Sequence, residues 1–207
     1  KFEQIVQQLE QKMHGTRLEI NLDALVHNLN FYRSRLKKNT KLMVMVKAYA
    51  YGSRNIEIAN LLQYNQVDYL AVAYTDEGVE LRQNGIHIPI MVMNPEVATF
   101  DKLLTYKLEA EIYSFAILQK FLQKIQSLSP KGVEKQFGIH IKFDTGMHRL
   151  GFYADDLEEL STILKENKDK ITVKSIFTHL AGSDEDQHDS YSQKQVNSFT
   201  KIAKKLE

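Results

Sequence analysis

The sequence contains no cysteine among its 207 residues. This absence excludes disulfide bridges, thiolate nucleophiles and cysteine metal sites, and it is typical of proteins from a reducing compartment. Long hydrophobic runs are also missing, because no apolar stretch approaches the roughly 18 residues of a membrane span. The N-terminus lacks the apolar centre of a signal peptide. We therefore expect a cytoplasmic protein that does not enter a membrane.

An excess of charge of one sign is missing too. The chain carries 27 Lys and Arg against 26 Asp and Glu, spread along its length, for a formal net charge of +1. Nucleic acids and anionic membrane surfaces attract proteins with a one-sided positive field, so we expect neither as a partner. Hydrophobic residues make up 43% of the chain, which is enough to bury one sizeable core.

What the chain does contain is a repeated pattern of apolar segments, each followed by an amphipathic stretch with helical spacing. The six segments begin near residues 42, 69, 88, 109, 138 and 171. This alternation predicts an α/β fold with a parallel sheet. Either an open doubly wound sheet or a (β/α)8 TIM-type barrel fits it. The segment 47–54 has one glycine where a dinucleotide-binding loop needs three, which favours the barrel. A barrel runs to about 250 residues, so this one is expected to be incomplete, with about six βα units.

The N-terminal part follows a different pattern. Residues 2–13 have helical spacing, and Gly15 is a typical helix end. We therefore divide the chain into a linker helix over residues 1–15 and a barrel domain over residues 16–207. Residues 17–22, RLEINL, alternate like a half-buried strand.

Some helix boundaries further along carry their own signals. Asn94 followed by Pro95 is typical of a helix N-cap with proline in the first turn, and Gly85 is typical of a helix end. The last helix is expected to pack on the sheet through one face, formed by Tyr191, Val196, Phe199 and Ile202.

Candidate functional residues gather at three strand ends, which in a parallel barrel share one mouth. They are Lys47, Tyr49 and Tyr51; Lys142, Asp144, His148 and Arg149; and His179, Ser183 and Asp184. Each group alone has a structural explanation: a strand-end lysine can extend into solvent, Asp144 and Arg149 can form an ion pair, and His179 can be a core residue. The acidic run after His179 is typical of a solvated helix start, so we expect no metal site.

Taken together, these groups favour a chemical site. A lysine, an arginine and a histidine at one mouth suit an anionic ligand with an aromatic ring. An amine that is desolvated among other cations is more readily neutral, and a neutral amine can attack an aldehyde to form a Schiff base.

Three motifs carry a resemblance to a known family. VKAYAYG (46–52) resembles the pyridoxal-phosphate lysine motif of alanine racemases, and KFDTGMHRLG (142–151) resembles the second signature of that family. FTHLAGSDE (177–185) is similar to a third. The resemblance covers about residues 16–207 and implies the N-terminal barrel domain of a fold type III enzyme. Two positions depart from the pattern, Arg54 and His148, where the family often has glycine.

The resemblance implies a role for five residues. Lys47 would hold pyridoxal 5'-phosphate as a Schiff base and act as acid and base on one face of the substrate α-carbon. Tyr51 would bind the cofactor phosphate, and Arg149 would lie beside the cofactor's phenolic oxygen and the substrate carboxylate. His179 would pack near the pyridine ring. Lys142 matches a lysine that is carbamylated in many members, and the resulting anion would orient Arg149.

The implied activity is the interconversion of L- and D-alanine, which supplies D-alanine for peptidoglycan. Family members continue into further barrel strands and a β-rich domain, whose tyrosine is the second base and acts across a homodimer. The chain by itself is therefore expected to be inactive. Residues 1–14 resemble the junction of bacterial fusions between a cell-wall ligase and a racemase, although a cloning remnant would also explain them.

Two other functions stay open at this point. A non-enzymatic pyridoxal-phosphate homeostasis protein is built on the same barrel and is short, but such proteins lack the signature at residues 142–151. A racemase or decarboxylase acting on lysine, ornithine or serine also stays open, because substrate specificity in the family lies largely in its C-terminal part.

Overall fold

The computed structural model describes residues 18–128 and 136–206. The chain divides into two compact units, residues 1–38 and residues 39–207, which are described separately below. The helix predicted over residues 2–13 and its end at Gly15 lie outside the described residues. The division at residue 15 therefore stays a prediction.

In the first unit, the described part consists of a short irregular segment and helix α2 (Leu22–Arg35). The side chain of Asn21 accepts a hydrogen bond from the Ala24 N–H at 3.0 Å and so caps the helix. The half-buried strand predicted over residues 17–22 was wrong for the part of it that is described. Residues 18–21 form no regular structure, because an extended segment becomes a strand only beside a partner, and none of the strand pairs found in the described residues includes it.

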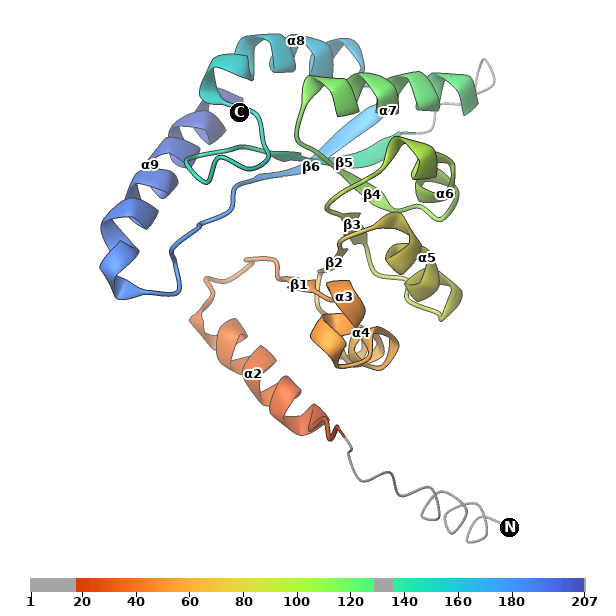
Figure 1. Cartoon of the computed structure of the whole chain (residues 1–207), viewed down its shortest axis with the longest axis vertical. Helices are drawn as coiled ribbons and strands as arrows, with labels where there is room; N and C mark the ends of the chain where they lie inside the picture. Colours follow the sequence, from red (N-terminus) through yellow and green to blue (C-terminus); the bar gives the residue numbers. More distant parts are fainter. Residues whose placement is uncertain (1–17, 129–135, 207) are drawn as a thin grey trace, which may run out of the picture. The chain divides into compact units, whose positions relative to one another are not determined.

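The second unit is built on a six-stranded parallel sheet whose strands follow chain order (Figure 1). The strands are β1 (Met43–Met45), β2 (Tyr69–Val72), β3 (Ile90–Val92), β4 (Glu109–Ile112), β5 (Phe137–Lys142) and β6 (Ile171–Phe177). All six predicted strands are confirmed, and every neighbouring pair is parallel. This arrangement is that of six consecutive βα units of a TIM-type barrel.

Helices alternate with these strands, and Figure 1 shows α5 to α8 following the outer side of the row of strands. The helices are α3 (Lys47–Gly52), α4 (Asn55–Tyr64), α5 (Thr75–Gln83), α6 (Phe100–Thr105), α7 (Phe115–Leu128), α8 (Leu157–Glu166) and α9 (Asp189–Leu206). Short 3-10 turns precede α6, α8 and α9: η1 (Val97–Thr99), η2 (Ala154–Asp156) and η3 (Asp186–His188).

One of the two predicted helix boundaries is confirmed. Gly85 follows the end of α5 and has a φ of +83°, as expected of a residue just past a helix. The N-cap predicted at Asn94 was wrong, because η1 begins only at Val97. The Asn94 N–H donates to the Ala73 carbonyl at 2.9 Å, so the pairing of β2 with β3 continues through Asn94 and delays the helix.

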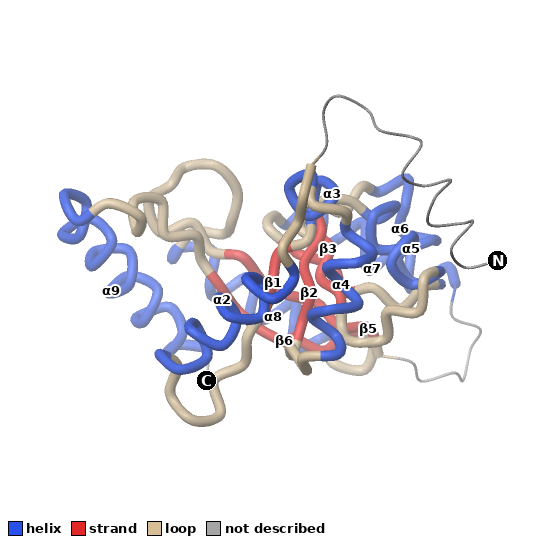
Figure 2. Tube along the Cα trace, turned by 90° about the horizontal axis from the view of Figure 1, so that it is seen from below, coloured by secondary structure: helices blue, strands red, loops and turns tan. Residues whose placement is uncertain are grey.

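The two faces of the sheet differ in chemistry, because successive side chains on a strand point to opposite faces. One face is apolar and packs against the helices, which Figure 2 shows lying along one side of the strands for α4 to α7. Helices α5, α6 and α7 each contribute a fully buried side chain to this core, namely Leu81, Leu103 and Phe121. The other face carries polar residues on β4 and β5, namely Glu109, Glu111, His140 and Lys142.

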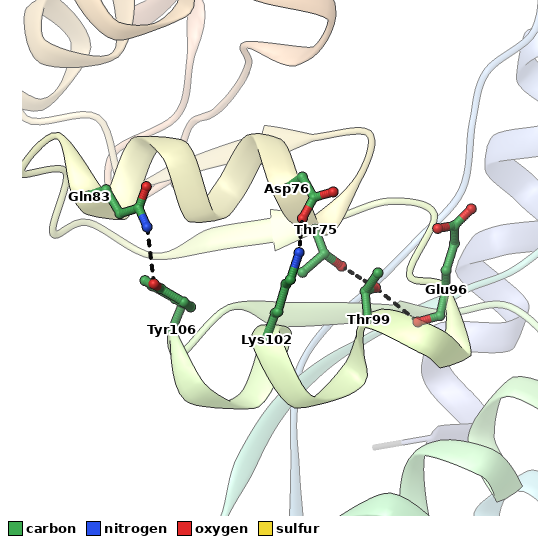
Figure 3. A network of polar contacts seen from close by, with 7 residues as sticks. All are labelled: Thr75, Asp76, Gln83, Glu96, Thr99, Lys102 and Tyr106. Carbon is green, nitrogen blue, oxygen red and sulfur yellow. Dashed lines mark hydrogen bonds and ion pairs between the residues drawn. The ribbon is translucent and has the colours of Figure 1, made fainter.

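Polar contacts also join neighbouring helices on the outside of the unit, as Figure 3 shows for α5 and the segment formed by η1 and α6. The pairs are Thr75 with Thr99 (2.8 Å), Asp76 with Lys102 (2.9 Å) and Gln83 with Tyr106 (3.1 Å). The Thr99 hydroxyl donates to the Glu96 carbonyl at 2.9 Å, so the Thr75 hydroxyl is the donor to Thr99. An exposed ion pair such as Asp76–Lys102 contributes about 1 kcal/mol at most, so apolar packing dominates the stability of this region.

The loop after β5 closes on itself through backbone hydrogen bonds. The Phe152 N–H donates to the Lys142 carbonyl, and the Asp144 N–H donates to the Phe152 carbonyl, both at 2.9 Å. This close return requires Gly151, whose φ is +136°. A Cβ at this position would lie 2.4 Å from the Asp144 nitrogen and 2.6 Å from the Phe143 carbonyl carbon. Both atoms belong to the backbone and cannot move aside cheaply.

We therefore predict that Gly151→Ala lowers the free energy of unfolding by at least about 3 kcal/mol, because it combines a backbone clash with a positive φ. Gly85→Ala is the matched control, since Gly85 also has a positive φ but a Cβ there would meet nothing within 4 Å. The control should lose about 1 kcal/mol. Urea unfolding of both variants measures the difference, and equal losses would contradict the role of the clash.

Candidate functional site

The predicted site residues lie at the carboxyl edge of the sheet. Lys47 is the first residue of α3, one residue after the end of β1. Lys142 is the last residue of β5, and Arg149 and His179 lie in the loops after β5 and β6. Desolvation lowers the pKa of His179, and the positive charges of Arg149, Lys142 and Lys47 lower it further. These four residues therefore share one electrostatic environment. Tyr51 lies in α3 and is 68% exposed. Arg149 and His179 are exposed as well, whereas Lys47 is half-buried and Lys142 is buried.

The backbone that follows Lys47 has an unusual conformation. Residues 48–51 of α3 all lie in the left-handed region, with φ between 50° and 56°. Each such residue costs about 1–2 kcal/mol when it carries a side chain, so this turn needs support from elsewhere. Glu77 in the first turn of α5 provides part of it, because one carboxylate oxygen accepts the Ala48 N–H and the other accepts the Ala73 N–H, each at 2.6 Å.

Sequence reasoning missed Glu77. An acidic residue in the first turn of a helix is usually explained by the helix dipole. The contact with Ala48 joins α5, which follows β2, to the turn after β1, and no local pattern in the sequence indicates it.

The loop after β5 is organised by the carboxylate of Asp144. Its oxygens accept the N–H groups of Gly146 (2.8 Å), His148 (3.0 Å) and Arg149 (3.0 Å). Burial of Asp144 opposes ionisation, but these three donors outweigh it and lower the pKa of the carboxyl group. The ion pair considered between Asp144 and Arg149 is thus replaced by a bond to the Arg149 backbone. His148 has a φ of +57°, which fits the glycine that the family resemblance implies at this position.

Helix α9 holds the loops that carry Arg149 and His179. Gln195 is fully buried; its Oε1 accepts the Ala181 N–H (3.0 Å) and its Nε2 donates to the His179 carbonyl (2.9 Å). The Tyr191 hydroxyl donates to the Gly146 carbonyl at 2.5 Å.

The face predicted for α9 was therefore only partly right. Ile202 is buried as expected, but Val196 is 40% exposed and Gln195 is buried beside it. The reason is that the Gln195 amide satisfies loop backbone groups that an apolar side chain would leave unpaired.

Lys142 forms a buried ion pair with Glu111 of the neighbouring strand. Its Nζ lies 3.1 Å from Glu111 Oε1, and the two side chains are 5% and 0% exposed. The Lys142 ammonium also lies 5.6 Å from the centre of the Phe177 ring. Burial raises the pKa of Glu111, while Lys142, Arg149 and Lys47 oppose that rise. The amine for which the resemblance implies carbamylation thus has the Glu111 carboxyl group as a direct partner.

A second polar cluster lies on the same sheet face, one step further from the edge. His140 is 1% exposed and bonds Glu109 through Nε2 and Ser175 through Nδ1, each at 2.7 Å. The ring of Tyr69 meets His140 edge to face, with 5.6 Å between ring centres. Both ring nitrogens of His140 thus have hydrogen-bond partners, so we interpret this cluster as part of the structural core.

Metal binding and membrane insertion find no support in residues 18–128 and 136–206. Within these ranges, no cluster of three or more His, Cys, Asp or Glu side chains could hold a metal ion. Over the same ranges, no helix has both the length and the apolar character that crossing a membrane requires.

The fold and the site together define a parallel β/α-barrel domain with a lysine, an arginine and a histidine at the carboxyl edge of its strands. Comparison with known families refines this class. The family described as "Alanine racemase, N-terminal domain" matches residues 20–207, and the chain belongs to this family.

Individual relatives agree with this assignment. "Alanine racemase 2" of Caldanaerobacter subterraneus is 36% identical over 197 residues, which cover 95% of this chain and 49% of that protein. The solved structure of an alanine racemase from Clostridium difficile in complex with cycloserine is 37% identical, with a TM-score of 0.81 over 90% of this chain and 50% of that one. An "Amino-acid racemase" of Enterococcus faecalis is 35% identical over 89% of this chain and 25% of that protein. The chain spans about half the length of most of the curated relatives that it matches.

The geometry of Asp144 predicts a pH-dependent stability difference. Its folded-state pKa lies below the ordinary value of 3.8, so its contribution is fully present above that value and is lost as the pH falls through the folded-state pKa. Asp144→Asn should lower the free energy of unfolding by about 1–3 kcal/mol at pH 7, because an amide cannot accept three N–H groups as a carboxylate does.

Urea unfolding of the wild type and of Asp144→Asn from pH 7 to pH 3 measures this difference. The two curves should stay apart down to about pH 4 and begin to converge only as the pH falls further, towards the lowered pKa of Asp144. A difference that does not change with pH would contradict a role for the ionised carboxylate. Asp155→Asn, at an exposed position in η2, is the control and should show no difference at any pH.

Proposed function

We propose that the protein to which this chain belongs interconverts L- and D-alanine with pyridoxal 5'-phosphate. The observation that carries the proposal is the position of Lys47 at the carboxyl end of β1, in the same electrostatic environment as Lys142, Arg149 and His179. The names of the relatives support the substrate. Supply of D-alanine for peptidoglycan, a cytoplasmic location and a homodimer belong to the same proposal.

The residues present fit this cofactor. Its phosphate and phenolic oxygen are anionic and its aldehyde reacts with a primary amine, and the edge offers one partly buried amine, Lys47, among other cations. We assign Lys47 as the covalent anchor, Tyr51 as a ligand of the phosphate, and Arg149 and His179 as neighbours of the ring. When bound, pyridoxal phosphate delocalises the negative charge that develops at the substrate α-carbon.

The chain's own residues then have separate tasks. Lys47 Nζ takes and returns the α-proton on one face of the substrate. Arg149, whose side chain is exposed at the edge, binds an anionic oxygen of the substrate or the cofactor. The lowered pKa of His179 favours its neutral ring at pH 7, and a neutral ring can pack on an aromatic ligand without adding another charge. The base for the opposite face is assigned to a tyrosine outside this chain.

A second candidate is a racemase acting on another amino acid. The relative named "Amino-acid racemase" matches this chain about as well as those named for alanine, so the matched half of the protein does not discriminate between substrates. A non-enzymatic pyridoxal-phosphate carrier is disfavoured by the signature at residues 142–151, which such proteins lack.

The first test locates the cofactor. The full-length protein is loaded with pyridoxal phosphate, reduced with borohydride so that the cofactor stays on the amine that carries it, and digested for peptide mass mapping. We predict that the label lies on Lys47. Lys142 is the internal control and should carry no label, because it is also a lysine of the site but is buried and paired with Glu111. A label on any residue other than Lys47 would sink the proposal.

The second test measures activity. The full-length protein should form D-alanine from L-alanine, and Lys47→Ala should reduce the rate by at least about a thousandfold, because a covalent and acid–base group is lost. Lys102→Ala is the matched control, since Lys102 is an exposed lysine paired with Asp76 on α5 and should retain the wild-type rate. Faster turnover of serine, lysine or ornithine than of alanine would favour the second candidate.

A further inference from the structure

Glu77 of α5 binds backbone groups of two separate segments with one carboxylate. Its Oε1 accepts the Ala48 N–H at 2.6 Å, and its Oε2 accepts the N–H groups of Ala73 (2.6 Å) and Tyr74 (3.0 Å). The side chain is half-buried. Hydrogen bonds to an ionised acceptor are roughly twice as strong as those between neutral groups, so these contacts tie the two segments to each other.

Capping of α5 explains only half of this arrangement. A glutamate at the third helical position commonly accepts the N–H of the N-cap residue, and the contact with Tyr74 is of this kind. One carboxylate oxygen is enough for it. The other oxygen binds Ala48, which lies 29 residues earlier in the chain and belongs to the turn after β1. Helix capping does not require this second contact, which therefore needs its own explanation.

The second contact fixes the backbone next to Lys47. The Ala48 N–H belongs to the peptide group that joins Ala48 to Lys47. On the other side of the lysine, the Val46 N–H donates to the Ala71 carbonyl of β2 at 2.9 Å. Backbone geometry determines the direction of the Cα–Cβ bond and the rotamers that are allowed, so these two bonds determine where the Lys47 side chain can reach.

The conformation of the turn makes such support necessary. Residues 48–51 all have a positive φ, and none of them is glycine. Side chains disfavour this region because Cβ approaches the following carbonyl oxygen, so four such residues in succession persist only where other contacts hold them. The Ala50 N–H donates to the Val46 carbonyl at 3.0 Å, but this bond lies within the turn and does not join it to the rest of the unit. Without Glu77, we expect the turn to relax and to displace Lys47.

We propose that Glu77 is a positioning residue for Lys47: its carboxylate holds the turn after β1 against the end of β2 and so directs the Lys47 amine toward the substrate α-carbon. The inference rests on the proposed function for the role of Lys47. Glu77 acts through the backbone of Ala48 and touches neither the cofactor nor the substrate.

Two substitutions separate this role from helix capping. Glu77→Asp keeps the charge but is one methylene shorter, so its carboxylate can still cap α5 but should not reach Ala48. Glu77→Gln keeps the length, but its amide nitrogen is a donor, so one of the two segments loses its acceptor. Glu80→Gln is the matched control. Glu80 lies on the same helix and accepts the side-chain amide of Asn55 at 2.9 Å, so it joins α5 to α4 without binding the turn.

The first test examines the turn in the full-length protein without added cofactor. Hydrogen exchange followed by peptide mass analysis reports on the N–H groups of Ala48 and Ala50. We expect exchange within residues 47–52 to be at least about tenfold faster in Glu77→Asp and Glu77→Gln than in the wild type, and unchanged in Glu80→Gln. An unchanged exchange rate in Glu77→Asp overturns the inference. The measurement needs no racemase activity, so its outcome is separate from that of the proposed function.

The second test examines catalysis in the protein loaded with pyridoxal phosphate. A lysine displaced by about 1 Å transfers the α-proton more slowly, whereas the loop of Arg149 is held independently by Asp144. Glu77→Asp should therefore lower kcat about tenfold to a hundredfold, while the KM for alanine changes less than about threefold. Glu80→Gln should retain the wild-type values of both. Equal kcat values for Glu77→Asp and Glu80→Gln, or a loss confined to KM, would overturn the positioning role.

Discussion

Parallel hydrogen bonding between six strands in chain order is the constraint on which the rest of the second unit depends. Because every pair is parallel, the carboxyl ends of all strands meet at one edge, and residues far apart in the sequence become neighbours there. Lys47, Lys142 and His179 lie at the carboxyl ends of three different strands and still share one electrostatic environment. The parallel strand order therefore brings the site residues to one edge, and no long loop is needed to do so.

Side chains hold the loops at this edge, because they form the hydrogen bonds to backbone groups that a neighbouring strand would form in a sheet. Backbone N–H groups in a turn have no strand partner, and leaving them unpaired in a buried setting is costly. Glu77 accepts such groups beside the left-handed turn after Lys47, and Asp144 does so in the loop before Arg149. Gln195 adds a third anchor at the loop that carries His179. The candidate reactive side chains thus lie on loops whose backbone is held by side-chain hydrogen bonds.

The sequence predicted the six strands because their apolar runs are strong and regular, and strand positions together with the parallel rule located Lys47, Lys142, Arg149 and His179 at one edge. The strand over residues 17–22 failed because alternation alone does not supply a partner strand. The boundary at Asn94 failed because pairing with Ala73 extended the strand past a local capping signal.

The supporting residues were missed for a different reason. Glu77, Glu111 and Gln195 act through partners on other elements, which no local pattern encodes. For Glu111 a weak signal did exist, since the strand EAEIY places two acidic residues two positions apart within an otherwise apolar run. In a strand that spacing puts both carboxylates on one face, so a polar face was predictable, although its partners on β5 were not.

The polar face itself is difficult to explain by stability. A buried ion pair gains little net free energy, because the desolvation of two charges offsets most of their attraction, and an apolar pair of similar volume is often as stable or more so. The inner cluster of Glu109, His140 and Ser175 at least satisfies the groups it buries. The outer pair does not, because Glu111 keeps one buried oxygen without a partner in the described structure. An arrangement that is costly for folding, and that lies beside the cations of the edge, is better explained by the electrostatics of the site than by the stability of the sheet.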